Sequence, residues 1–268
     1  MNLGTRAARL LSLPDIGWGI PRIASEYTPG IAPARARTGD ACGIPRVIHT
    51  VFGLWDARGM SWRHRWILGG WKRRHSAPDW QIVCWNKQTA EAFIRRESPE
   101  HWDLYQSLPR NIQRADLLRY LLLYRLGGFY VDLDVRCVIG IDRVRRVHAS
   151  TGVLTCVETT LTPQRARRIG HEEPIRNGRA EHTQRIANFF LGSVAGHPLL
   201  GAIIALLRQR SVLDIHTDYD VLYTTGPDVV TEVIQRARET SDLVVIDESE
   251  ASRLFQHLKF GSWRSASS

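Results

Sequence analysis

This chain of 268 residues lacks a long hydrophobic run. Its longest apolar stretch, residues 191–207, is interrupted by His197-Pro198 and is shorter than the ~20 residues of a membrane-spanning helix. The start of the chain has too little apolar content for the hydrophobic segment of a signal peptide. We therefore expect a soluble, cytoplasmic protein, with a peripheral position at the membrane as the alternative.

Cysteine is scarce, and its spacing matches no metal-binding pattern. The four cysteines are Cys42, Cys84, Cys137 and Cys156. The last three lie in apolar runs and are predicted to be buried thiols, as expected in a reducing compartment.

Lysine is also rare, because 33 of the 36 basic residues are arginine and the formal net charge is +9. Arginine favours bidentate contacts with phosphates and carboxylates. This excess suits a nucleotide, an anionic glycan or an acidic membrane surface, although a compositional bias of the genome could also produce it. No basic block is long enough for a nucleic-acid arm and no recognition motif is present, so nucleic acid is not expected as a partner.

The overall composition is that of an ordinary globular protein, with 43% hydrophobic and 24% charged residues. Residues 1–43 are rich in proline, glycine, alanine and arginine and predict an irregular extension. A short amphipathic helix at residues 6–13 could touch a membrane there, but a loosely packed tail is the preferred interpretation. Residues 44–268 are predicted to form one domain.

Strand-like and helix-like segments alternate from residue 47 onward. The β-rich runs 47–52 and 80–85 are followed by helical segments at 60–75 and 87–96, which predicts an α/β fold with a single, mostly parallel Rossmann-like sheet and flanking helices. The polar segment 159–182 is predicted to be a loop that orders over a ligand. Further strands are expected at 135–138, 152–157, 187–194 and 243–246, further helices at 100–107, 111–126, 198–207 and 225–238, and a loop at the C-terminus.

One stretch, LLRYLLLYRLGGFYVDLDV at residues 117–135, organises the rest. Leucines recur at helical spacing in its first half, and Gly127 and Gly128 then end the helix. The aromatic and β-branched run that follows predicts a buried strand, which ends in Asp132 and Asp134.

In a strand, Asp132 and Asp134 would leave the same face roughly 7 Å apart. Two such carboxylates repel each other unless a cation lies between them. The preceding apolar run places them at the mouth of a sheet, where open α/β folds bind ligands. The pair therefore predicts a metal site, and a solvated loop pair is the alternative.

Asp116 and Arg119 share one face of the helix that leads into this strand. They could form a surface ion pair worth under about 1 kcal/mol. Alternatively, their helix directs them towards the same site as the two aspartates.

The run RADLLRYLLLYRLGGFYVDLDV resembles the signature of the DXD-containing sugar transferases, of the family 32 type. These include fungal initiating and sphingolipid mannosyltransferases, bacterial capsule and lipopolysaccharide glycosyltransferases, and large glucosylating toxins. Four other segments agree with it, and the similarity covers residues 44–263. They are IPRVIHTVFG, ANFFLGSVAGHPLL, TTGP and HLKFGSW.

This resemblance implies a GT-A-type nucleotide-diphospho-sugar transferase fold. It also implies a UDP- or GDP-linked sugar donor, a divalent metal (Mn²⁺ or Mg²⁺), and a hydroxyl of a glycan or lipid-linked glycan as acceptor. Transfer with retention of anomeric configuration and a role in surface polysaccharide synthesis, such as that of a capsule, are implied as well.

The resemblance also assigns roles to the central acidic residues. Asp134 would ligate the metal, and Asp132 would contact the ribose or sugar and the metal with its water shell. Asp116 and Arg119 would hold hydroxyls of the donor sugar.

Further roles fall on the outlying segments. In the β-rich run at residues 47–52, Thr50, Val51 and Phe52 would contact the donor, and Phe52 stands where the family often has a tryptophan that packs against the base. Asn188 would lie near the sugar. The C-terminal segment would complete the site: His257 or Ser262 at the metal and phosphates, and Trp263 over the diphosphate.

Other functions fit the sequence less well. A catalytically silent nucleotide-sugar or anionic-ligand binding protein of the same fold is the main alternative. A haloacid-dehalogenase-type phosphatase would use Asp132 as nucleophile but needs a lysine before a later acidic pair, and Lys259 follows Asp247-Glu248. A glycosidase needs carboxylates on two sides of a sugar ring, which neighbouring acids on one face cannot supply.

Overall fold

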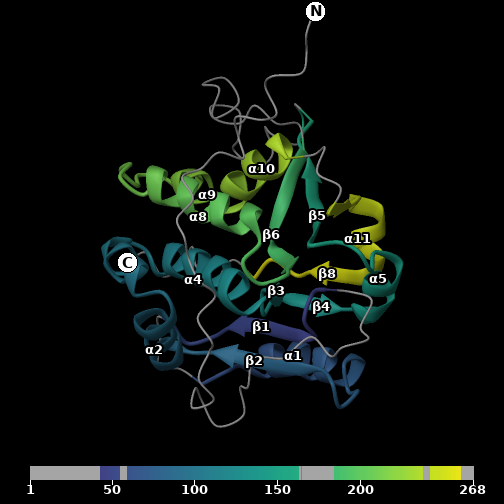
Figure 1. The fold of residues 1–268 in the computed structure, drawn as a ribbon. Helices are drawn as coiled ribbons and strands as arrows, with labels where there is room; N and C mark the ends of the chain where they lie inside the picture. The colour runs from purple at the N-terminus through teal and green to yellow at the C-terminus, as the bar shows by residue number, and fades with distance from the viewer. Residues whose placement is uncertain (1–42, 55–58, 163, 165–183, 238–241, 261–268) are drawn as a thin grey trace, which may run out of the picture. The chain divides into compact units, whose positions relative to one another are not determined.

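Six strands form the central sheet, in the order β2-β1-β3-β6-β5-β7 (Figure 1). The computed structural model describes residues 43–54, 59–162, 164, 184–237 and 242–260, and all of these belong to one unit, Pro33–Ser268. The strands are β1 (Val47–Val51), β2 (Gln81–Trp85), β3 (Gly128–Val131), β5 (Val153–Thr160), β6 (Gln184–Ser193) and β7 (Leu243–Ile246). The predicted extension at residues 1–43 lies, apart from Gly43, outside the described residues.

The sheet is mostly parallel. β1 pairs in parallel with β2 and β3, and β5 pairs in parallel with β7. β6 alone runs the other way, antiparallel to both β3 and β5. The α/β class with a mostly parallel sheet is therefore confirmed, and it is the arrangement that a GT-A-type fold predicts.

Helices flank both faces of the sheet (Figure 1). Alternate residues of β3 show the division: Tyr130 faces Arg119 of α4, whereas Phe129 and Val131 belong to the core that also contains residues of α1 and α11. The helices are α1 (Trp62–Arg74), α2 (Lys87–Glu97), α3 (Trp102–Ser107), α4 (Asn111–Leu126), α5 (Asp142–Val147), α8 (Pro198–Arg210), α9 (Asp218–Thr224), α10 (Pro227–Arg236) and α11 (Glu248–Leu254), with a 3₁₀ turn η2 (Pro99–His101) before α3.

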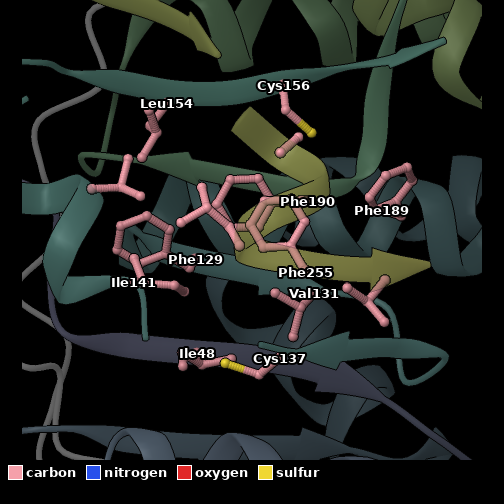
Figure 2. Packing of buried hydrophobic residues seen from close by; sticks show 14 of the residues in the cluster. Ile48, Phe129, Val131, Cys137, Ile141, Leu154, Cys156, Phe189, Phe190 and Phe255 are labelled. Carbon is pink, nitrogen blue, oxygen red and sulfur yellow. The ribbon is translucent and has the colours of Figure 1, made fainter. Parts of the chain in front are cut away.

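Aromatic side chains fill the core on the α1 and α11 side of the sheet. Figure 2 shows Phe129, Phe190 and Phe255 packed together between strands. The Phe190 and Phe255 rings lie 4.3 Å apart between centroids. This packing joins β3 and β6 to the C-terminal part of the chain.

α4 ends where the sequence predicts, at two glycines. Gly127 and Gly128 have φ angles of 67° and 96°, which favour glycine. A Cβ atom at Gly128 would lie 2.6 Å from the Val47 carbonyl oxygen. The glycines thus let the chain turn from α4 directly into β3 beside β1.

The aspartates that follow β3 do not extend the strand, contrary to the sequence-based expectation. β3 ends at Val131, and the Val135 N–H donates to the Asp132 carbonyl at 3.0 Å. This hydrogen bond closes a tight turn, so the alternation of side chains along a strand does not apply to Asp132 and Asp134.

A second sheet of two antiparallel strands follows the turn: β4 (Val135–Cys137) and β8 (Phe255–His257). The prediction of a terminal loop is wrong for residues 255–257, which pair with β4 in the register Val135↔His257. This pairing brings His257 next to the aspartate turn.

Two further expectations, on Cys84 and on the loop at 159–182, differ from the structure or lie largely outside the described residues. Cys84 is exposed on β2, because its side chain alternates with those of buried Val83 and Trp85, while Cys137 and Cys156 are buried as predicted. Most of the loop predicted at 159–182 is outside the described residues. None of the helices in the described part of the chain combines the length and hydrophobicity needed to cross a bilayer.

Candidate donor and metal site

Arg119 is the centre of a buried charge cluster at the end of β3. Its guanidinium lies 3.0 Å from Asp116 and 3.2 Å from Asp132, and it donates to the Asn188 carbonyl at 2.8 Å. The Arg119 and Asp116 side chains are only 2% and 3% exposed, so the alternative of a surface ion pair is wrong. The structure thus brings together four residues that the sequence singled out.

Asp116 is held on both carboxylate oxygens. Asn188 Nδ2 donates to Oδ1 at 3.1 Å, and the Thr225 hydroxyl donates to Oδ2 at 2.8 Å. Burial raises the pKa of Asp116 to about 6, against the opposing effect of the Arg119 guanidinium. Asp116 is therefore mostly ionised at neutral pH and orients Arg119 and Asn188.

The neighbouring carboxylates keep Arg119 charged. Burial acts to lower the Arg119 pKa, but Asp132 and Asp116 outweigh it and raise that pKa above its ordinary value. The guanidinium also lies 4.5 Å from the centroid of the Tyr130 ring. Arg119 is a fixed positive charge behind the aspartate turn.

Asp132 is the accessible member of this cluster. Its side chain is 28% exposed, whereas those of Asp116 and Arg119 are almost fully buried. The Tyr130 hydroxyl donates to Asp132 Oδ1 at 2.8 Å. Asp132 therefore presents a pre-oriented carboxylate at the end of the sheet.

Asp134 faces the C-terminal segment instead. Its Oδ1 lies 3.4 Å from His257 Nε2, and its Oδ2 accepts a hydrogen bond from the Phe260 N–H at 3.0 Å. The Leu258 N–H donates to the Asp134 carbonyl at 2.9 Å. Burial acts to raise the pKa of Asp134, but hydrogen bonding and the charge of His257 lower it overall.

The fit of a divalent metal can be judged from this donor set. Two ligands of one ion with bonds of about 2.1 Å lie roughly 3 Å apart, close to the 3.4 Å between Asp134 Oδ1 and His257 Nε2. The His257 Nδ1 atom is buried without a hydrogen-bond partner. Carboxylate oxygens suit both Mg²⁺ and Mn²⁺. Asp134 and His257 fit as two ligands, although no group of three His, Cys, Asp or Glu side chains with metal-binding geometry occurs in the described ranges.

The residues predicted to contact the donor lie at the carboxyl end of β1, the strand between β2 and β3. Thr50 is buried, with its hydroxyl oxygen unpartnered, and Val51 ends the strand. The Phe52 ring packs 5.4 Å from the His64 ring, which lies 5.4 Å from the Phe260 ring. This row of rings connects β1 to the segment that bonds Asp134.

Two of the predicted donor-binding residues cannot be placed. Ser262 and Trp263 lie outside the described residues, so their roles stay predictions. Two contributions were missed: Thr225, which belongs to the TTGP motif but received no role, and the Phe260 N–H, for which the sequence gives no signal because a backbone contact depends on the fold alone.

Comparison with known proteins identifies the region around this cluster. Residues 64–150 match the family described as "Glycosyltransferase sugar-binding region containing DXD motif". This range contains Asp116, Arg119, Asp132 and Asp134 and confirms the resemblance inferred from the sequence.

Two fungal proteins are similar over much of the chain. Inositol phosphoceramide mannosyltransferase 3 of Schizosaccharomyces pombe is 28% identical over 70% of this chain and 44% of its own length. Mannosyl phosphorylinositol ceramide synthase CSH1 of Saccharomyces cerevisiae is 24% identical over 80% of this chain and 47% of its own length. The chain thus spans less than half the length of either relative.

Among solved structures, the match with the PaToxG glycosyltransferase covers 74% of this chain and 70% of that one, with a TM-score of 0.47 and 18% sequence identity. Residues 64–150, which hold the motif residues of the candidate site, are thus similar to glycosyltransferase sugar-binding regions that contain a DXD motif.

Proposed function

We propose that the protein is a metal-dependent glycosyltransferase that moves a sugar from a nucleotide-diphosphate donor to a hydroxyl of a glycan or glycolipid. The observation that carries the proposal is the joining of the Asp116, Arg119 and Asp132 cluster to the Asp134 and His257 pair through one turn. The match to the DXD family over the same residues supports it.

In this proposal the buried residues position the exposed ones. Asp116 orients Arg119 and Asn188, and Arg119 fixes the carboxylate of Asp132 where it can receive hydroxyls of the donor. Because these groups are already oriented, binding the donor requires little reorganisation. The direct contact of Asp116 and Arg119 with donor hydroxyls, implied by the resemblance, remains a prediction.

Asp134 and His257, with Asp132 nearby, would hold Mn²⁺ or Mg²⁺, which when bound would offset the negative charge of the departing diphosphate. Mn²⁺ is the better candidate, because imidazole is a poor partner for Mg²⁺. Ser262 and Trp263 are proposed to contact the diphosphate, and Thr50, Val51 and Phe52 the nucleoside. Retention of anomeric configuration is also part of the proposal.

The names of the relatives favour a mannosyl donor and a glycolipid acceptor over a capsular polysaccharide. Both relatives are named for transfer to inositol-containing ceramides, so an acceptor with a phosphorylated headgroup is the first to test.

The first test is nucleotide release from a panel of UDP- and GDP-sugars, with Mn²⁺ and again with EDTA. We expect slow hydrolysis of one donor that EDTA abolishes. NMR of the anomeric product then reports retention or inversion. If no donor is hydrolysed and none gives a metal-dependent thermal shift, the proposal fails in favour of a binding protein that lacks activity.

A further inference from the structure

α1 exposes two large aromatic side chains next to the proposed site. Trp62 is 72% exposed and Trp66 is 47% exposed, and the other large hydrophobic residues with high exposure in the described ranges are the aliphatic Val147, Val212 and Leu213. Positions 62, 66, 69 and 73 follow a helical spacing of four, three and four residues, so Trp62, Trp66, Gly69 and Arg73 share one face. The opposite face of α1 buries Ile67 and Trp71 in the core.

The charge on this helix is of one sign. α1 contains five basic residues and no acidic one: Arg63, Arg65, Lys72, Arg73 and Arg74. The guanidinium of Arg63 lies 5.5 Å from the Trp62 ring centroid, and that of Arg136, on β4, lies 5.8 Å from the Trp66 ring. Each exposed ring therefore has one arginine guanidinium beside it.

Tryptophan beside arginine suits the interface of an anionic bilayer. An indole ring has an apolar body and a polar N–H, and it concentrates at the level of the lipid headgroups. Basic side chains near such a surface gain from its negative potential. A polyanion in solution would attract the arginines but gives no reason for two exposed tryptophans.

We propose that the Trp62, Trp66 and Arg73 face of α1 docks on the surface of an anionic lipid membrane. The face lies near the candidate site, because the Trp66 ring centroid is 5.8 Å from the guanidinium of Arg136, and Arg136 follows Asp134 by two residues. Docking would bring the lipid headgroups close to Asp132 and Asp134. Delivery of a lipid acceptor to the site in this way rests on the proposed function, whereas membrane binding by α1 does not depend on it.

The test is sedimentation of the full-length protein with phosphatidylcholine vesicles, with and without phosphatidylserine, in the absence of metal and donor. We expect binding to the anionic vesicles only. The double variant Trp62→Ala/Trp66→Ala should weaken it at least about tenfold, as expected for the loss of two buried rings. Arg63→Gln/Arg73→Gln should weaken it about fivefold per charge at low salt.

Two control variants separate docking from general surface effects. Val212→Ser/Leu213→Ser removes exposed apolar groups elsewhere, and Arg143→Gln/Arg146→Gln removes exposed charge from α5; both should bind like the wild type. Thermal unfolding of each variant checks the fold. The proposal is overturned if wild type ignores anionic vesicles, if the tryptophan variant binds undiminished, or if the controls lose as much binding. Because the assay has no donor, failure of transferase activity does not affect it.

Discussion

Arg119 is the side chain that holds the buried charge cluster of the candidate site together. It bridges two carboxylates and a backbone carbonyl while almost fully buried. Removing it leaves Asp116 buried without its cation, so that this carboxyl must keep an unpaired charge or take up a proton. Breaking a buried pair in this way typically costs about 3–5 kcal/mol, a large part of a domain's stability.

We therefore expect Arg119→Ala to lower the free energy of unfolding by about 3–5 kcal/mol, measured by urea denaturation. Exposed Arg146→Ala on α5 is the matched control and should change it by no more than about 0.5 kcal/mol. Equal effects of the two substitutions would show that the cluster is not a structural anchor.

His49 is a second buried polar residue with a defined state. Trp85 Nε1 can only donate, so its 3.1 Å contact makes His49 Nδ1 an acceptor, and Nε2 donates to the Gly127 carbonyl at 3.0 Å. Burial lowers the pKa of His49 to about 4, with the Gly127 bond opposing. The neutral ring therefore links β1 to the glycine turn before β3.

This lowered pKa predicts a loss of stability in acid. The unfolded state binds a proton to His49 below about pH 6.5 and the folded state only near pH 4, so stability falls as the pH drops through that window. Between about pH 7 and pH 4.5 the loss from this group should be about 2–3 kcal/mol.

His49→Gln provides the comparison, because an amide can donate to the Gly127 carbonyl and does not titrate. Urea unfolding of both proteins at the two pH values should show a smaller loss in the variant. The same loss in both would assign the acid sensitivity to other groups.

At the scale of elements, the α4–turn–β3 unit fixes where the aspartates lie. Gly128 and Gly196 both have positive φ angles, of 96° and 73°, but only at Gly128 would a Cβ meet a backbone atom closely, at 2.6 Å from Val47 O. At Gly196 there is nothing within 4 Å. Comparing substitutions at these two positions therefore distinguishes the energetic cost of a steric clash from that of backbone strain.

Gly196→Ala should cost about 1–2 kcal/mol, the ordinary penalty of a left-handed residue. Gly128→Ala should cost more than that, because β1 and β3 must also move apart. Thermal or urea unfolding of the two variants measures the difference, and equal costs would mean that the sheet accommodates the methyl group freely.

At the scale of the molecule, the sequence predicted the parts of the fold that have a strong local signal. The leucine periodicity of α4 placed that helix at Asn111–Leu126, and the β-rich runs of β1 and β2 gave the first two strands. The short polar helices α9 and α11 have no apolar periodicity, so they were missed. β8 is three residues long and depends on pairing with β4, far away in the chain.

In the candidate site, too, local sequence patterns predicted the residues but not the contacts between distant segments. The motif brought Asp116, Arg119 and Asp132 to attention, and the structure joins them. The hydrogen bonds from the Asp132 N–H to the Phe189 carbonyl and from the Phe260 N–H to Asp134 depend on contacts distant in sequence. Local spacing suggested a flat pair of strand acids, whereas the two acids bind separate partners.

We propose that the aspartate turn and β8 together hold a divalent metal with a nucleoside diphosphate. Electron paramagnetic resonance of Mn²⁺, titrated with GDP or UDP present, tests it in wild type, Asp134→Asn and His257→Ala. Exposed Asp214→Asn and Gln256→Ala are the matched controls. We predict that both site variants weaken Mn²⁺ binding at least about tenfold while the controls do not. Wild-type Mn²⁺ affinity in Asp134→Asn would contradict the account.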